Sequence, residues 1–277
     1  MKHTKLISSC AALLALGVIS SSVMAYEEMS EVTKSGHAGG FVGLGAIYAP
    51  DYEGGDDYEA NIAPFGRYNW ANNRYISLGG TSGTEKAGRL KANVISKDQS
   101  NIWEFGPLLQ YRLERDDLDN SKVDKLKGTD AATEFGAFVG LNSGPWTAAL
   151  TVATDVSSEH DGTLVYLNGG YKIPVNNKLT MQLGASLTWA SDDFMEEYFG
   201  VTGSESTKTG LSKYQASSGF KDVGFGVTGY YKFNKSWGLL GNVGYTRMLN
   251  DAEDSPIVDD VGDENQYEAI LAVAYFF

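Results

Sequence analysis

The segment Gln266-Tyr-Glu-Ala-Ile-Leu-Ala-Val-Ala-Tyr-Phe-Phe277 decides the fold class. Counting back in steps of two from Phe277 gives Tyr275, Val273, Leu271, Ala269 and Tyr267, an apolar stripe with aromatic rings at both ends. A period of two is that of an extended strand, and we expect the residues between these to form a small or polar face. Rings at both ends of an outward face are typical of strands that cross an outer membrane. We therefore interpret the segment as the closing strand of a membrane barrel.

The same alternation recurs along the whole chain. Segments with a period of two lie near residues 38–49, 58–70, 74–81, 87–96, 101–114, 130–142, 146–157, 162–173, 178–190, 221–233, 237–249 and 266–277. Short turns such as 71–73 alternate with longer acidic loops such as 191–220. This layout predicts an all-β fold, a transmembrane antiparallel up-and-down β-barrel of about 12 strands with its short turns and both termini in the periplasm. A barrel of 10 strands is the alternative, because the third and fourth segments have the weakest pattern.

The N-terminal residues resemble an export signal. Lys2 and Lys5 precede an apolar run over residues 11–19, and small residues then lead to Ala25 and Tyr26. The run is too short to span a membrane as a helix. We therefore expect a cleaved signal peptide, with cleavage between Ala25 and Tyr26.

The chain thus divides into a signal peptide (1–25), a periplasmic N-terminal segment (26–37) and an outer-membrane β-barrel (38–277). Cys10, the single cysteine, lies in the first part, so the mature chain is expected to have neither a disulfide nor a thiol nucleophile. The net charge of −13 becomes more negative once the signal is removed. A nucleic-acid partner is excluded, because phosphate binding needs clustered lysine and arginine.

The aromatic residues predict where the membrane interface lies. All five tryptophans fall on the apolar parity of a predicted strand and close to one of its ends. An aromatic girdle at the interface requires this placement. The predicted girdle consists of Trp70, Trp103, Trp146, Trp189, Trp237, Tyr275 and Phe277.

The charged residues predict the opposite face. Those that share the polar parity are Glu59, Arg67, Arg89, Lys91, Glu104, Arg112, Glu134, Asp155, Lys172, Asp222, Lys232 and Glu268. A charge that faces lipid at mid-depth costs roughly 2–4 kcal/mol, so turning every strand over would cost tens of kcal/mol. We expect these residues to face an enclosed lumen and to pair there. Arg247 breaks the rule but lies near the outer end of its strand. The alternative is a soluble sandwich or lipocalin-like barrel, in which the apolar parity would face inward.

Five motifs resemble the MltA-interacting protein/OmpV family of outer-membrane proteins. They are Ala49-Pro-Asp-Tyr-Glu-Gly54, Arg115-Asp-Asp117, Glu197-Tyr-Phe-Gly-Val201, Gly219-Phe-Lys-Asp-Val-Gly224 and Leu249-Asn-Asp-Ala-Glu-Asp-Ser-Pro-Ile-Val258. The resemblance covers nearly the whole mature chain and is weakest over residues 82–99. It implies an outer-membrane barrel and, for some members, a scaffold that links a murein hydrolase (a lytic transglycosylase) to a murein synthase.

Residues that could carry chemistry are few. His160 lies in Ser157-Ser-Glu-His-Asp-Gly162, which we interpret as a solvated polar turn rather than a general base. The acidic loops 51–57 and 251–264 lack the spacing of a calcium loop, and we interpret them as solvated faces. Shared divalent cations of the lipopolysaccharide leaflet are a weaker hypothesis. Lumen glutamates are expected in ion pairs rather than in a glycosidase pair. We expect no catalytic residue, no metal site and no cofactor.

The family resemblance, together with the lack of a catalytic set, implies a non-catalytic scaffold in cell-wall metabolism, in the outer membrane of a Gram-negative bacterium. Its expected surroundings are outer-membrane lipid, lipopolysaccharide and the barrel-assembly machinery, with a murein hydrolase or synthase as partner by family resemblance. The segment 26–37, with the adjacent turns, is expected to meet that partner. One alternative is a narrow passive channel with a preference for cations, constricted by the loop 191–220. Adhesion or sensing by the long loops and an enzyme at the barrel mouth are the others.

Overall fold

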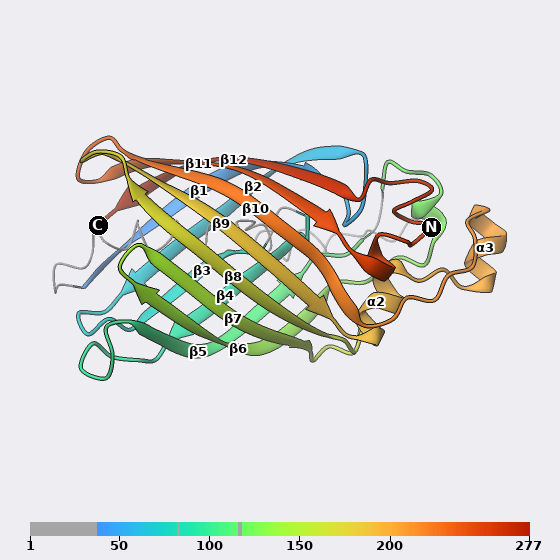
Figure 1. Ribbon diagram of the computed structural model, residues 1–277, viewed down its shortest axis with the longest axis horizontal. Coiled ribbons are helices and arrows are strands. Elements are labelled where there is room, and N and C mark those ends of the chain that lie inside the picture. Colours follow the sequence, from blue (N-terminus) through green and yellow to red (C-terminus); the bar gives the residue numbers. More distant parts are fainter. Residues whose placement is uncertain (1–37, 82–83, 116–117) are drawn as a thin grey trace, which may run out of the picture.

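A computed structural model describes residues 38–81, 84–115 and 118–277. It contains a closed barrel of twelve antiparallel strands (Figure 1). The strands are β1 (Gly39–Pro50), β2 (Tyr58–Asn69), β3 (Tyr75–Gly80), β4 (Ala87–Asn93), β5 (Trp103–Arg112), β6 (Ala132–Ser143), β7 (Trp146–Asp155), β8 (Thr163–Pro174), β9 (Leu179–Ala190), β10 (Gly219–Lys232), β11 (Trp237–Met248) and β12 (Asn265–Phe276). The predicted signal peptide and N-terminal segment lie outside the described residues.

Closure of the barrel removes every open sheet edge. Strand β1 pairs with β2 on one side and with β12 on the other, where Phe41 lies opposite Phe276 and Tyr48 opposite Ala269. Each strand therefore satisfies its backbone groups from two neighbours, as a hydrocarbon surrounding requires. The prediction of about twelve strands is confirmed. Strands β3 and β4 are the shortest, in agreement with their weak alternation.

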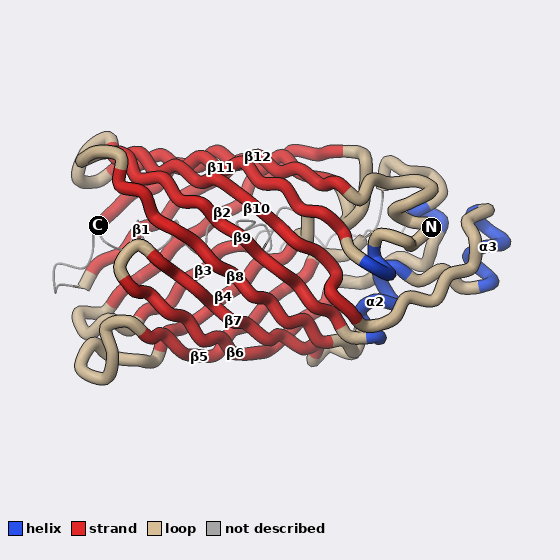
Figure 2. The backbone as a smooth tube through the Cα atoms, viewed as in Figure 1, coloured by secondary structure: helices blue, strands red, loops and turns tan. Residues whose placement is uncertain are grey.

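The two ends of the barrel differ sharply (Figures 1 and 2). The short-turn end carries tight connections, such as Gly144-Pro145, where Gly144 takes a positive φ of 60°. The long-loop end carries the helices α2 (Asp192–Phe199) and α3 (Gly203–Thr209) and the one-turn helices η1 (Val123–Lys125) and η2 (Asn250–Ala252). Within the described part of the chain, no helix has the length and apolar composition to cross a membrane.

One connection at the short-turn end is longer than predicted. Strand β4 stops at Asn93 rather than near residue 96. The side-chain carbonyl of Asn93 accepts hydrogen bonds from the backbone N–H groups of Ile95 and Phe105, both at 3.1 Å. Because a side chain takes the place of a strand neighbour, the ladder between β4 and β5 ends there and residues 94–102 form a loop.

The outward face of the barrel is apolar and the inward face contains buried charges. Ile62 and Trp146 are 68% and 63% exposed, whereas Arg112 and Glu134 are 1% and 0% exposed. A soluble barrel would show the reverse. The alternative fold, with the apolar parity in a dry centre, is therefore wrong.

The lumen is not polar throughout. Towards the short-turn end, Phe41, Phe65 and Phe276 pack together with centroid separations of 6.2 and 5.8 Å, next to Tyr230 and Leu240. Ile270 and Phe276 occupy inward positions of β12, so the expectation of only small or polar residues there is wrong. Other apolar side chains surround these positions, so burial of an aromatic ring there is favourable.

Candidate functional site at the outer mouth

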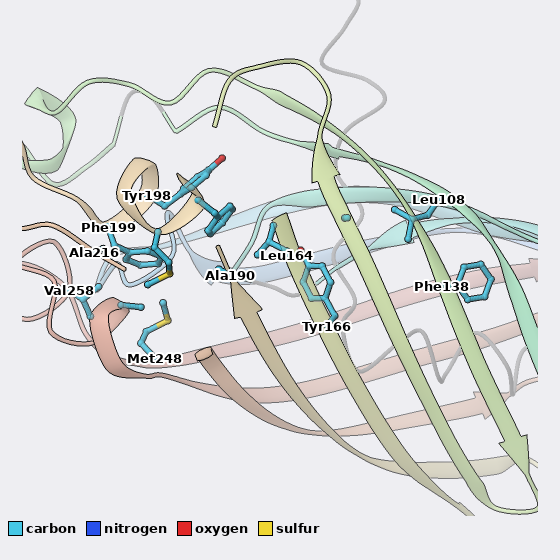
Figure 3. Close-up of a cluster of buried hydrophobic side chains, with 14 of the residues drawn as sticks. Leu108, Phe138, Leu164, Tyr166, Ala190, Tyr198, Phe199, Ala216, Met248 and Val258 are labelled. Carbon is cyan, nitrogen blue, oxygen red and sulfur yellow. The ribbon is translucent and has the colours of Figure 1, made fainter. Parts of the chain in front are cut away.

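The long loops that carry helix α2 and the one-turn helices η1 and η2 fold over the long-loop end of the barrel, and we call them the cap (Figure 1). Helix α2 buries Phe194, Met195, Tyr198 and Phe199, all 6% exposed or less. Figure 3 shows Tyr198 and Phe199 on this helix, beside Leu164 and Tyr166 of the barrel wall. The side chains of the cap and the wall thus form one apolar cluster that continues into the barrel.

Arg112 lies at the centre of a buried ionic network directly below the cap. Its Nε donates to Glu134 Oε1 at 2.8 Å and its Nη1 donates to Glu53 Oε1 at 3.1 Å. The same Nη1 donates to the backbone carbonyl of Glu85 at 3.3 Å, and Gln110 Nε2 donates to Glu134 Oε2 at 2.6 Å. Removing one member of such a network leaves a buried charge without compensation.

Lys221 is a second cation of this network, and sequence analysis missed it. A β-bulge shifts the pairing of β10 with β9 between Phe220 and Asp222. As a result Lys221 and Asp222, which are consecutive, both turn inward and are buried. Lys221 Nζ lies 2.7 Å from Glu53 Oε2, 2.7 Å from Asp222 Oδ2 and 3.6 Å from Glu85 Oε1. A strict period of two hides a residue of this kind, because the bulge inserts one position.

We call this network the mouth cluster; it consists of Glu53, Glu85, Arg112, Glu134, His160, Lys221 and Asp222. Four carboxylates face two permanent cations and one imidazole, so the cluster retains negative charge.

His160 is buried in the mouth cluster, so its interpretation as part of a solvated turn is wrong. Its Nδ1 accepts a hydrogen bond from the Gly162 N–H at 3.0 Å, which places the proton of the neutral ring on Nε2. That Nε2 lies 3.3 Å from Glu134 Oε1. The ring also packs edge-on against Phe194 and Tyr198, at 5.2 and 5.8 Å between centroids. Helix α2, which follows some thirty residues later, excludes the solvent from this turn.

The loop 51–57 is likewise not a solvated face throughout. Asp56 and Asp57 are exposed, but Asp51 and Glu53 are buried at 7% and 8% exposure. Burial raises the pKa of the Glu53 carboxyl, and it raises that of Asp51 to about 6. The first part of this loop therefore lines the mouth, while Asp56 and Asp57 remain on a solvated face.

The family comparison covers the barrel almost completely. The family model described as MltA-interacting protein MipA matches residues 42–277. The chain belongs to this family. The predicted resemblance is confirmed.

Similar proteins place this MipA-family chain in the bacterial outer membrane. It is 29% identical over 109 residues to the MltA-interacting protein of Escherichia coli, covering 39% of this chain and 43% of that protein. It is 29% identical over 170 residues to the outer membrane protein OmpV of Vibrio cholerae, which covers 57% of this chain and 61% of that protein. The chain thus spans less than two thirds of the length of the curated relatives it matches. The NanC porin structure has a TM-score of 0.47 at 9% identity, over 84% of this chain and 98% of that one.

The motifs that carry the family resemblance meet at the mouth of this MipA-family barrel. Glu53 and Lys221 belong to two of them, and Arg115, from a third, donates from Nη1 to the Tyr198 carbonyl at 2.6 Å. The last motif contributes Ser255, whose Oγ donates to the Phe199 carbonyl at 2.7 Å. A second apolar layer of the cap contains Tyr52, Val123, Leu126, Val201, Leu211 and Ile257. Asp116 and Asp117 of the third motif lie outside the described residues.

The predicted girdle residues lie on the outer surface at strand ends. Trp70, Trp103, Trp146, Trp237, Tyr275 and Phe277 are between 41% and 63% exposed at the short-turn end, and Trp189 is half-buried at the other. Three of the tryptophans contact tyrosines: Trp70 and Tyr68 lie 5.1 Å apart between centroids, Trp146 and Tyr171 lie 4.6 Å apart, and Trp237 and Tyr275 lie 5.0 Å apart.

The other predicted lumen charges are distributed over the barrel height. Arg67, Arg89 and Glu104 are buried, and Glu59, Lys91, Asp155, Lys172, Lys232 and Glu268 are half-buried. Near the short-turn end, Arg67 lies over the Tyr75 ring at 3.4 Å, and Tyr75 donates to Glu104 at 2.6 Å. Asp155 instead caps its own loop by accepting from three consecutive backbone N–H groups, Glu159 to Asp161.

These contacts offer no catalytic relay among the described residues. Ser157 Oγ donates to Asp155 at 2.6 Å, but the His160 ring points to Glu134 instead of to this pair. The lumen glutamates Glu104 and Glu134 are held by arginines. In the ranges that the structure describes, no group of acidic, histidine or cysteine side chains has the arrangement of a metal site. The family and the relatives indicate no enzymatic class.

Proposed function

We propose that the chain is a non-catalytic scaffold of the outer membrane that is closed towards the outside and binds a periplasmic murein enzyme. The observation that supports this most strongly is the cap, whose apolar residues pack on the barrel wall over a buried ionic network. An open porin would instead keep a wetted entrance at this end.

The short-turn end is the face available to a periplasmic partner. The connection 94–102 is its longest described element, and it is locked to the neighbouring turn: Lys97 N donates to the Asn72 carbonyl at 2.8 Å and Arg74 Nε to the Val94 carbonyl at 3.1 Å. A rigid double turn loses little entropy on binding. The name of the Escherichia coli relative points to the lytic enzyme MltA as the kind of partner.

Affinity capture tests this proposal. The full mature chain, solubilised in detergent, is immobilised and exposed to a purified MltA-type hydrolase. We expect retention that falls when residues 27–36 are deleted or when Lys97→Glu reverses a charge on the double turn. Lys208→Glu, the same charge change on exposed α3 at the opposite end, is the matched control and should leave retention unchanged. Equal retention by all four proteins, or none by the unmodified chain, would overturn the proposal.

A narrow passive channel is the second candidate, and half-buried inward charges such as Lys172, Lys232 and Glu268 are the observation in its favour. It requires the cap to move away from the mouth. The excess of carboxylates at the mouth would then favour cations.

A further inference from the structure

A small cavity of about 30 Å³ lies beneath the cap, next to the mouth cluster. The loop after β1, the connection before β4, the end of β5 and helix α2 all contribute to its wall. This volume holds about one water molecule.

Several polar atoms around this cavity are unsatisfied. By distance and angle, neither carboxylate oxygen of Asp51, nor the Oε2 of Glu85, nor the hydroxyl of Tyr198 makes a hydrogen bond to a side chain among the described residues, and the backbone N–H of Asp119 is the one main-chain donor directed at Asp51. Asp51, Glu85 and Tyr198 line the cavity and are 7%, 4% and 6% exposed. Burial of an unsatisfied polar group costs about 1–3 kcal/mol. A bound water, a proton on one carboxylate, or both would supply what is missing.

The charged and polar groups that face Asp51 supply no free cation for it, and the donors among them are limited to the Asp119 N–H and the Tyr198 hydroxyl. They come from its own loop (Glu53, Asp57), from β2 (Glu59), from the connection before β4 (Glu85, Lys86), from β5 and the segment after it (Arg112, Glu114, Arg115, the Asp119 N–H) and from α2 (the Tyr198 hydroxyl). The three cations are engaged elsewhere. Lys86 pairs with Glu59, Arg112 with Glu134 and Glu53, and Arg115 donates to the carbonyls of Tyr198 and Glu197.

We propose that the cavity is a proton-binding site that couples closure of the cap to the acidity outside the cell. A proton on Asp51, with one water, holds the loop 51–57 against Glu85 and Tyr198. Loss of the proton leaves a buried carboxylate among like charges and loosens the cap. The proposal does not depend on the partner or on the channel alternative.

The direction of the pH dependence follows from the linkage between proton binding at Asp51 and closure of the cap. Burial raises the pKa of Asp51 from 3.8 to about 6, while Lys86 opposes the shift. The closed cap thus binds the proton more tightly than an open one does, so its extra stability is complete below pH 4 and is lost as the pH rises through 6. A difference of this size corresponds to roughly a hundredfold change in the closing equilibrium over the full pH range, of which about tenfold falls between pH 5 and pH 8.

Thiol labelling in a cysteine-free background tests the proposal, because Cys10 is the single native cysteine. With Cys10→Ser in place, Ala252→Cys introduces a thiol under the cap, at a position that is 0% exposed, and Ser204→Cys introduces one at an exposed position of α3. Both proteins are reacted with an impermeant maleimide in liposomes at pH 5 and pH 8. The ratio of the two rates cancels the pH dependence of the thiol itself.

We expect the ratio of buried to exposed labelling to rise about tenfold between pH 5 and pH 8. Asp51→Asn, a neutral side chain of the same shape with its own donor, should hold the ratio at the low value across this range. Asp56→Asn, an exposed acid of the same loop, should behave like the unmodified protein. A flat ratio in the protein with native Asp51, or an unchanged pH dependence in Asp51→Asn, would overturn the proposal.

Discussion

Arg112→Met tests whether the mouth cluster holds the cap and the barrel together. Methionine keeps the apolar stem of the side chain but removes the guanidinium that pairs with Glu134 at 2.8 Å and with Glu53 at 3.1 Å. Glu134 then lies buried without its main partner, and Glu53 keeps Lys221 as its one close cation in the mouth cluster. Breaking a buried pair in this way costs about 3–5 kcal/mol, and we expect a loss of that size in the free energy of unfolding.

The assay is reversible urea unfolding in lipid vesicles, followed by tryptophan fluorescence. The matched control is Arg247→Met, since Arg247 also pairs with two glutamates, Glu253 and Glu264, but its side chain is 36% exposed. The control should change the free energy much less. The double variant Arg112→Met with Glu134→Gln should recover part of the loss, because the stranded charge is removed. An Arg112→Met protein as stable as the control would refute the reasoning.

Two further changes probe the cap. Phe194→Ala empties a fully buried position against His160 and Tyr198 and should cost about 3–5 kcal/mol of unfolding free energy. Phe135→Ala, on the lipid-facing surface, is the control and should leave maleimide labelling beneath the cap unchanged. Thr202→Ala removes the capping box of α3 and should cost that helix about 1 kcal/mol, seen as faster hydrogen exchange of its amides. Partial burial raises the pKa of Glu205, but the hydrogen bonds that its carboxylate accepts, first of all from the Thr202 hydroxyl, outweigh burial and lower the pKa overall. Protection of the α3 amides should therefore be present above about pH 4.5 and should fall on acidification. Slow exchange of α3 in Thr202→Ala would contradict the role of the box.

The strands were predictable because a membrane barrel repeats one simple rule. Each outward position must be apolar, so the parity of Trp103 or Arg112 indicates its face without any knowledge of the neighbouring strands. Even the short strands β3 and β4 follow it. The end of β4 did not, because the Asn93 side chain replaces a backbone partner.

The mouth was less predictable, since burial there depends on contacts between distant segments. His160, Asp51 and Glu53 have the local sequence of solvated turns, and only the packing of α2 and of the loop after β11 encloses them. Lys221 was missed for another reason: the bulge at Phe220 shifts the parity by one residue. The five family motifs were the one available signal, because each of them contributes to this end of the barrel.

Planar-bilayer recording of the purified full chain tests the central claim that folded loops close the outer mouth. The structure predicts no steady conductance at pH 5, where the cap is closed over the mouth cluster. A steady, ohmic conductance of the unmodified protein under these conditions would contradict it.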